Sequence, residues 1–231
     1  MKRKTVGVLG GMGPEATVDF MASVIALTPA GRDQDHIRML VDHNPGVPDR
    51  QAAMRGDRSA VSRVLGEMAL KLEAAGADFL VMPCNTAHVF LPEVLPKLNV
   101  PFIHIVAEAV AEIAGTQPNA RQVGVMATNA CIEAGVYQSA IRASGRDSIL
   151  PPADRQQELM ALILRIKRGD KSSEVRLAMR GIARDLAVRG AEVIIAGCTE
   201  IPLVLGHDDL DVPFVSSTEV LARRTVAMAI A

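Results

Sequence analysis

Two cysteines, Cys84 and Cys198, occupy matching positions in two parts of the sequence that resemble each other. The first lies in GADFLVMPCNTAHVFLPEV (residues 76–94) and the second in GAEVIIAGCTEIPLVLGHD (residues 190–208). Two opposed thiols can act as acid and base on the two faces of one carbon atom. A single cysteine is more often an inert core residue, but the matched positions of these two favour a chemical role.

The residues that follow each thiol are polar, namely Asn85 and Thr86 in the first copy and Thr199 and Glu200 in the second. Such side chains suit the N-terminal cap or first turn of a helix. A thiol at a helix N-terminus has a pKa below its ordinary value of about 8.5, so more of it is thiolate at neutral pH. We therefore expect both cysteines to be reactive.

Two further matches extend the repeat along the chain. Val6-Gly7-Val8 recurs at residues 123–125, and Val100-Pro101-Phe102 recurs at residues 212–214. With the cysteines, these matches make three anchors in one order at nearly one spacing, which indicates a duplicated α/β unit.

The apolar pattern supplies the elements that position the thiols. Short apolar runs predict buried strands at residues 5–9, 37–41, 79–82, 102–106, 122–126, 193–196 and 214–215. Helical periodicity predicts helices that include residues 60–75, 156–168 and 171–189. This alternation is typical of βαβ units, whose parallel sheets bind ligands at the carboxyl ends of their strands. Both thiols are expected at such ends.

The composition excludes several classes of function. The 231 residues carry a net charge of −1 and include no Trp, one Tyr and five Phe, which disfavours binding to nucleic acid. No apolar run approaches the roughly 18 residues that span a membrane, and the glycine-broken start does not predict a signal peptide. Three cysteines then indicate a reducing cytoplasm rather than a disulfide framework, and no Cys/His spacing predicts a metal site.

The first glycine-rich loop has two interpretations. Gly11, Gly13 and Ala16 fit a loose G-x-G-x-x-A pattern of the kind that binds dinucleotides. Pro14 interrupts that turn, and Asp42, the nearest acidic residue for a ribose, lies too late in the sequence. We therefore favour a loop whose backbone N–H groups bind a small anion such as a carboxylate.

Basic side chains near predicted strand and helix ends are candidate ligands for a substrate carboxylate. In the proline-stiffened loop HNPGVPDR, Arg50 can bind a carboxylate through two parallel hydrogen bonds, with Asp49 orienting it. A surface Arg–Asp pair is an equally good interpretation on spacing alone, and Lys167 is similarly open. We interpret Cys131 as a packing or at most lining residue, and the histidines at 36, 88, 104 and 207 as structural.

Four motifs together resemble the aspartate/glutamate racemase superfamily, and specifically its cofactor-independent aspartate racemase branch. They are VGVLGGMGPEAT, NPGVPDR at 44–50, MPCNTAH at 82–88 and AGCTE at 196–200, and the resemblance runs from end to end. It implies two similar α/β domains facing each other across a cleft, one of residues 1–98 plus 213–231 and the other of residues 99–212. It also implies a cytoplasmic homodimer that uses neither pyridoxal phosphate nor metal.

The resemblance further implies an isomerase with Cys84 and Cys198 as its acid/base pair on opposite faces of the substrate α-carbon. The residues that fall where the family binds its substrate are Met12, Gly13, Asp49, Arg50, Asn85, Thr86, Thr128, Lys167, Thr199 and Glu200. Relatives tend to have Thr or Gly where this chain has Asn129-Ala130-Cys131, which puts the choice of substrate in question.

The expected activity is racemisation of an acidic amino acid, most simply aspartate. Glutamate or a broad range of amino acids is the alternative substrate, and a non-catalytic binder of small dicarboxylates is the alternative function. The two thiols disfavour the one-thiol decarboxylases of the superfamily, and the Arg50 loop disfavours hydantoins. A redox dithiol is disfavoured because the chain has no C-x-x-C motif.

Overall fold

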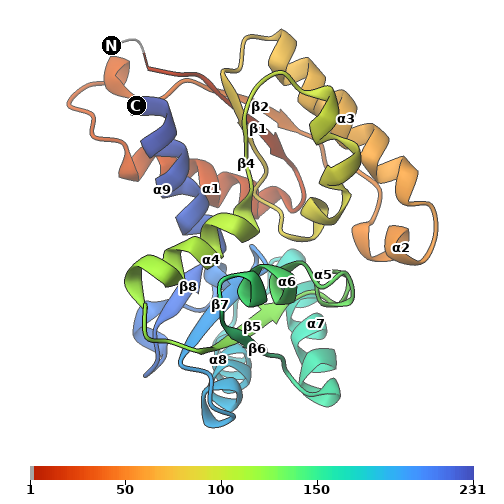
Figure 1. Cartoon of the computed structure of the whole chain (residues 1–231), viewed down its shortest axis with the longest axis vertical. Helices are drawn as coiled ribbons and strands as arrows, with labels where there is room; N and C mark the ends of the chain where they lie inside the picture. The colour runs from red at the N-terminus through yellow and green to blue at the C-terminus, as the bar shows by residue number, and fades with distance from the viewer. Residues whose placement is uncertain (1–2) are drawn as a thin grey trace. The chain divides into compact units, whose positions relative to one another are not determined.

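A computed structural model describes residues 3–231 and divides the chain into two compact units. Unit 1 extends to Ile105 and also includes Thr218–Ala231, and unit 2 is Val106–Ser217. Each unit has its own four-stranded parallel sheet with helices, which confirms the predicted α/β class of two duplicated units (Figure 1). The chain changes unit at 105/106 and 217/218, a few residues after the predicted 98/99 and 212/213.

The sheet of unit 1 has the strand order β2-β1-β3-β4. Its strands are β1 (Val6–Gly10), β2 (Met39–His43), β3 (Phe79–Val81) and β4 (Phe102–Ile103). Its helices are α1 (Pro14–Leu27), α2 (Arg50–Arg55), α3 (Arg58–Ala74) and, after its first residue, α9 (Ser217–Ile230). Figure 1 shows α9 beside α1, where the last helix of the chain completes the first unit.

Unit 2 repeats the same plan with the strand order β6-β5-β7-β8. Its strands are β5 (Gln122–Ala127), β6 (Asp147–Ile149), β7 (Val193–Gly197) and β8 (Phe214–Ser216). Its helices are α4 (Ile105–Thr116, after its first residue), α5 (Asn129–Glu133), α6 (Val136–Ala143), α7 (Ala153–Lys167) and α8 (Ser173–Val188). In both sheets the strand that precedes a thiol lies between the first strand and the last strand of its unit.

The strands differ from the prediction in three places. The run predicted at 37–41 begins two residues before β2, which is Met39–His43. The run at 102–106 is too long, because β4 ends at Ile103 and helix α4 begins at Ile105. Strand β6 was not predicted at all. It is a three-residue edge strand whose first residue, Asp147, is exposed, so it lacks the continuous apolar run that marks a buried strand.

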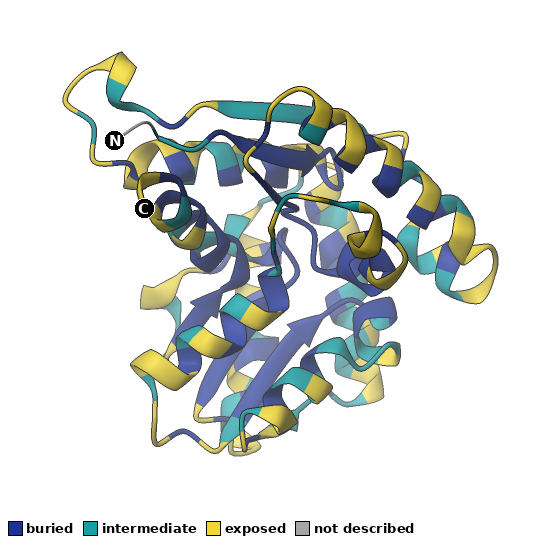
Figure 2. Ribbon diagram, turned by 45° about the horizontal axis from the view of Figure 1, so that its top comes forward, coloured by how far each residue is buried: buried dark blue, intermediate teal, exposed yellow. Residues whose placement is uncertain are grey.

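The glycine shared by the two Val-Gly-Val segments has a packing reason. A Cβ at Gly7 would lie 2.5 Å from Leu80 Cδ2, and one at Gly124 would lie 3.0 Å from Ala191 Cβ. The first strand of each unit therefore needs a residue without a side chain where its neighbours approach closely. Figure 2 shows the inner strands, which are β1, β3, β5 and β7, as mostly buried, and the outer faces of the helices as exposed. Among the described residues, no helix has the length and apolar character required to span a bilayer.

Candidate functional site

In unit 1 the predicted site residues gather on loops at the carboxyl ends of the strands. Cys84 lies just after β3 and is 5% exposed, and Asn85 and Thr86 beside it are also buried. Met12 and Gly13 follow β1, and the loop with Asp49 and Arg50 follows β2. Parallel neighbouring strands place these loops at one edge of the sheet, which is the edge where ligands bind in this architecture.

The loops after β1 and β2 are clasped together by close backbone contacts. Asn44 N–H donates to the Gly10 carbonyl at 3.2 Å, and Gly11 adopts a φ of +89° directly against the Asn44 backbone. A Cβ at Gly11 would lie 2.5 Å from the Asn44 carbonyl carbon, so glycine is required there. Gly11 N–H donates to Thr17 Oγ1 at 2.9 Å. This internal bond leaves Met12 and Gly13 as the loop's candidate donors to an anion.

Asp49 and Arg50 have separate roles in the structure. Asp49 is the N-cap of α2 and accepts a hydrogen bond from Ala52 N–H at 2.8 Å. Arg50 Nη1 donates to the carbonyl oxygens of Val47 and Pro48 at 3.1 and 3.2 Å. The loop carbonyls thus hold the Arg50 guanidinium group, and the role of Asp49 in orienting Arg50 stays a prediction.

In unit 2 the second thiol is part of a short polar chain. Cys198 Sγ donates to Glu200 Oε2 at 3.0 Å, and Lys167 Nζ lies 2.5 Å from Glu200 Oε1. Burial raises the pKa of the Cys198 thiol well above its ordinary value, the Glu200 carboxylate raises it further, and Lys167 opposes them. Because Glu200 is only 4% exposed in its side chain, the pair with Lys167 compensates a buried charge.

Tyr137 lies directly beneath the strand end that carries Cys198, and the sequence offered no reason to single it out. A Cβ at Gly197 would lie 2.7 Å from Tyr137 Cε2, so the ring occupies the space left by the glycine. The Tyr137 hydroxyl hydrogen-bonds with Ser217, whose Oγ donates to the Ala196 carbonyl at 2.7 Å. This buried network fixes the end of β7 immediately before the thiol.

The loop after β5 carries Thr128, and the segment Asn129-Ala130-Cys131 follows it. Thr128 is the N-cap of α5, and Asn129 Oδ1 accepts a hydrogen bond from Gln156 Nε2 at 2.8 Å. Ala130 and Cys131 are buried at 1% and 0% exposure. Cys131 is thus a core thiol, and the segment is tied to α7 through Asn129.

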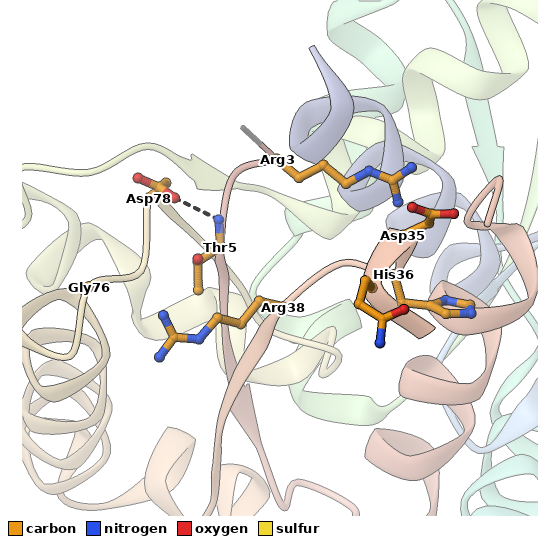
Figure 3. Close-up of a pocket in the computed structure, with 8 residues that line it drawn as sticks. Arg3, Thr5, Asp35, His36, Arg38, Gly76 and Asp78 are labelled. Atoms are coloured by element: carbon orange, nitrogen blue, oxygen red, sulfur yellow. Dashed lines mark hydrogen bonds between the residues drawn. The ribbon is translucent and has the colours of Figure 1, made fainter. Parts of the chain in front are cut away.

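A cavity of about 450 Å³ lies at the opposite, amino-terminal edge of the unit 1 sheet. Its polar side chains do not converge. Asp78 accepts a hydrogen bond from Thr5 N–H at 2.6 Å, and Figure 3 shows the guanidinium groups of Arg3 and Arg38 pointing to opposite sides. Because parallel sheets bind their ligands at the other edge, we assign no substrate to this cavity.

Each unit therefore brings its own predicted residues together at the carboxyl edge of its sheet. Unit 1 contributes Met12, Gly13, Asp49, Arg50, Cys84, Asn85 and Thr86, and unit 2 contributes Thr128, Lys167, Cys198, Thr199 and Glu200. The fold and this arrangement define a class of duplicated α/β proteins with one thiol at the same strand end of each unit.

Comparison with known proteins gives the family. The model of the Asp/Glu/Hydantoin racemase family matches residues 9–225, and the chain belongs to this family of isomerases. It is 31% identical over 228 residues to the broad specificity amino-acid racemase RacX of Bacillus subtilis (strain 168), covering 96% of each chain.

Two solved structures agree in fold along nearly the whole chain. The aspartate racemase of Picrophilus torridus is 26% identical, with a TM-score of 0.87 over 98% of this chain and 94% of that one. An aspartate racemase homologue from Pyrococcus horikoshii OT3 is 23% identical and has a TM-score of 0.82, over 99% of this chain and 100% of that one.

Proposed function

We propose that the chain is a pyridoxal-phosphate-independent amino-acid racemase whose preferred substrate is aspartate and whose acid/base pair is Cys84 and Cys198. The observation that carries the proposal is the presence of a buried thiol at the same strand end in both copies of a racemase fold. A single base can only return a proton to the face that lost it. Inversion of the centre therefore requires one group for each face.

The hydrogen bonds and charges around Cys198 suggest which of the two thiols acts first as the acid. A raised pKa keeps Cys198 protonated at neutral pH, which suits the acid that delivers a proton to the carbanion. In that direction Cys84 removes the α-proton. In the reverse direction the roles exchange, and each turnover leaves the enzyme ready for the opposite enantiomer.

Substrate recognition rests on Arg50 and Lys167. Lys167 is already paired with the Glu200 carboxylate, so its ammonium group lies where a carboxylate is accepted. A substrate carboxylate would take the place of the Glu200 carboxylate beside Lys167. The neighbouring Thr199 Oγ1, which donates to Glu200 Oε2 at 3.3 Å, would then donate to the substrate. The similarity to RacX favours a broader amino-acid range as the alternative, with glutamate the next acidic substrate.

Proton NMR of L-aspartate in D₂O, with chiral analysis of the product, tests the proposal directly. We expect loss of the α-proton signal and appearance of D-aspartate with the natural enzyme and with Cys131→Ser, whereas neither Cys84→Ser nor Cys198→Ser forms D-aspartate. Inversion by either of the last two variants would exclude the two-base mechanism. If a panel of amino acids gives neither exchange nor inversion, binding of dicarboxylates measured by calorimetry identifies the chain as a binder.

We also propose that the enzyme is a cytoplasmic homodimer. No disulfide joins Cys84, Cys131 or Cys198, which supports a reducing compartment. Helix α1 carries an exposed apolar face with Val18 at 59% and Ile25 at 49% exposure, seven residues apart on one side of the helix. Light scattering should give twice the chain mass, and lysine at both positions should give the monomer. Leu177→Lys, at a 69% exposed position on α8, is the control.

A further inference from the structure

His88 connects the main chain of the first thiol to the beginning of helix α4. Its Nδ1 lies 2.8 Å from the Cys84 carbonyl oxygen, and Ile105 N–H donates to its Nε2 at 3.2 Å. The ring is 2% exposed, and Ile105 is completely buried. One side chain thus satisfies two buried backbone groups that lie four and seventeen residues away along the chain.

These two contacts determine the protonation of the ring. Nε2 must be the unprotonated nitrogen because it accepts the Ile105 N–H, so Nδ1 carries the proton and donates to the Cys84 carbonyl. Burial, and after it the nearby His104, lowers the pKa of His88 to about 3, so the ring is neutral at neutral pH. With both nitrogens engaged, His88 cannot itself exchange protons with a substrate.

The Ile105 N–H is a group that its own helix does not satisfy. Ile105 is the first residue of α4, and the first N–H groups of a helix have no partner within the helix. A buried N–H without a partner costs about 1–3 kcal/mol, so the ring stabilises the start of α4. Ile105 is also the last residue before the chain passes into unit 2.

We propose that His88 is a positioning residue for Cys84, holding the thiol's main chain against the start of α4. The kinetic part of this proposal depends on the proposed function, whereas the structural part does not. The second copy has no counterpart, since the corresponding position is Pro202. There the start of α9 is joined to the strand before the thiol by Ser217 Oγ and the Ala196 carbonyl. Each copy thus connects its thiol segment to the next helix by a different side chain.

Two substitutions separate the two contacts of the ring. In His88→Asn the amide nitrogen reaches the place of Nδ1 and keeps the donor to Cys84, while the contact to Ile105 is lost. In His88→Gln the amide group reaches the place of Nε2 and keeps the acceptor for Ile105, while the contact to Cys84 is lost. His207→Asn, at an edge-to-face ring contact with Phe214 in unit 2, is the matched control.

The first readout is the alkylation rate of each cysteine by iodoacetamide, measured by mass spectrometry of the three cysteine peptides from one reaction. Cys131 and Cys198 are internal controls because both are buried in unit 2. We expect alkylation of Cys84 to accelerate at least about tenfold in His88→Gln and less than about threefold in His88→Asn, with the other two cysteines unchanged. Equal effects of both variants, parallel changes at all three cysteines, or no change would overturn the proposal.

The second readout is racemisation, in which an ångström-scale displacement of Cys84 lowers kcat by about 100-fold. We expect that loss in His88→Gln with little change in KM, a smaller loss in His88→Asn and none in His207→Asn. A natural enzyme that racemises no amino acid would contradict the proposed function alone, because the alkylation result still decides the role of His88. A natural enzyme that is active alongside an equally active His88→Gln would contradict the role of His88 alone.

Discussion

The two thiol segments occupy equivalent strand ends in two sheets of the same strand order, but different side chains surround them. Cys198 donates to a buried carboxylate that is paired with a lysine, whereas the contact described for the Cys84 segment is between its carbonyl and a neutral histidine. The two copies therefore share the position of the thiol in the sheet, but they differ in the side chains that surround it. The raised pKa of Cys198 supports the proposal that this thiol carries the proton at the start of the reaction.

The largest expected effect separates the two thiols by the face that each one serves. A substrate with chloride on Cβ, such as β-chloroalanine, loses its α-proton to one thiolate, forms the Cα–Cβ double bond and releases chloride. This elimination needs no second acid on the opposite face. We expect Cys84→Ser to slow it by about 10²–10⁴-fold for one enantiomer only, and Cys198→Ser for the other only. Pyruvate formation from the hydrolysed enamine measures the rate, and loss with both enantiomers in either variant would contradict the assignment.

The second expected effect concerns the glycine before Cys198, where the first copy has Pro83. In Gly197→Ala the new Cβ would lie 2.7 Å from Tyr137 Cε2, and the buried ring must move. We expect a loss of about 1–3 kcal/mol in the free energy of unfolding. Gly115→Ala, at an exposed position of α4 with no atom within 4 Å, is the control and should gain about 0.5–1 kcal/mol. Urea denaturation measures both, and equal stability of the two variants would exclude the Tyr137 contact.

The sequence predicts the features of the two thiol segments that depend on residues close together in the chain, and not those that depend on residues far apart in it. Both thiols, their polar neighbours and seven of the eight strands follow from apolar runs and from the repeat, because each is a local pattern. The pairing of Glu200 with Lys167 joins residues 33 apart, and Tyr137 and Gly197 are separated in the chain by one strand and two helices, so spacing carries no signal for either contact. For His88, the available signal was its presence in one copy opposite Pro202 in the other.

The third effect is a pH dependence of stability that comes from the first copy. The folded state holds His88 at a pKa of about 3 against about 6.5 when unfolded, so the unfolded chain binds more protons between these values. Its contribution is fully present above pH 6.5 and is lost as the pH falls toward 3. Between pH 7 and pH 5 we expect the natural protein to lose about 2 kcal/mol more than His88→Gln does. Urea denaturation at the two pH values checks this, and an equal loss would show that the ring is not held neutral.

The smallest effect concerns the charges around Cys198 in the second copy. It is small because substitution of these charges leaves burial, the largest cause of the raised pKa of Cys198, unchanged. Glu200→Gln removes the negative charge and lowers the pKa of the thiol, whereas Lys167→Met removes the opposing positive charge and raises it. Where Cys198 acts as the acid, the rate should then decline from a lower pH in the first variant and from a higher pH in the second. Thiolate absorbance in a Cys84→Ser, Cys131→Ser background measures the titration. Shifts in the same direction would mean that solvent access, rather than the Glu200–Lys167 pair, distinguishes the second thiol from the first.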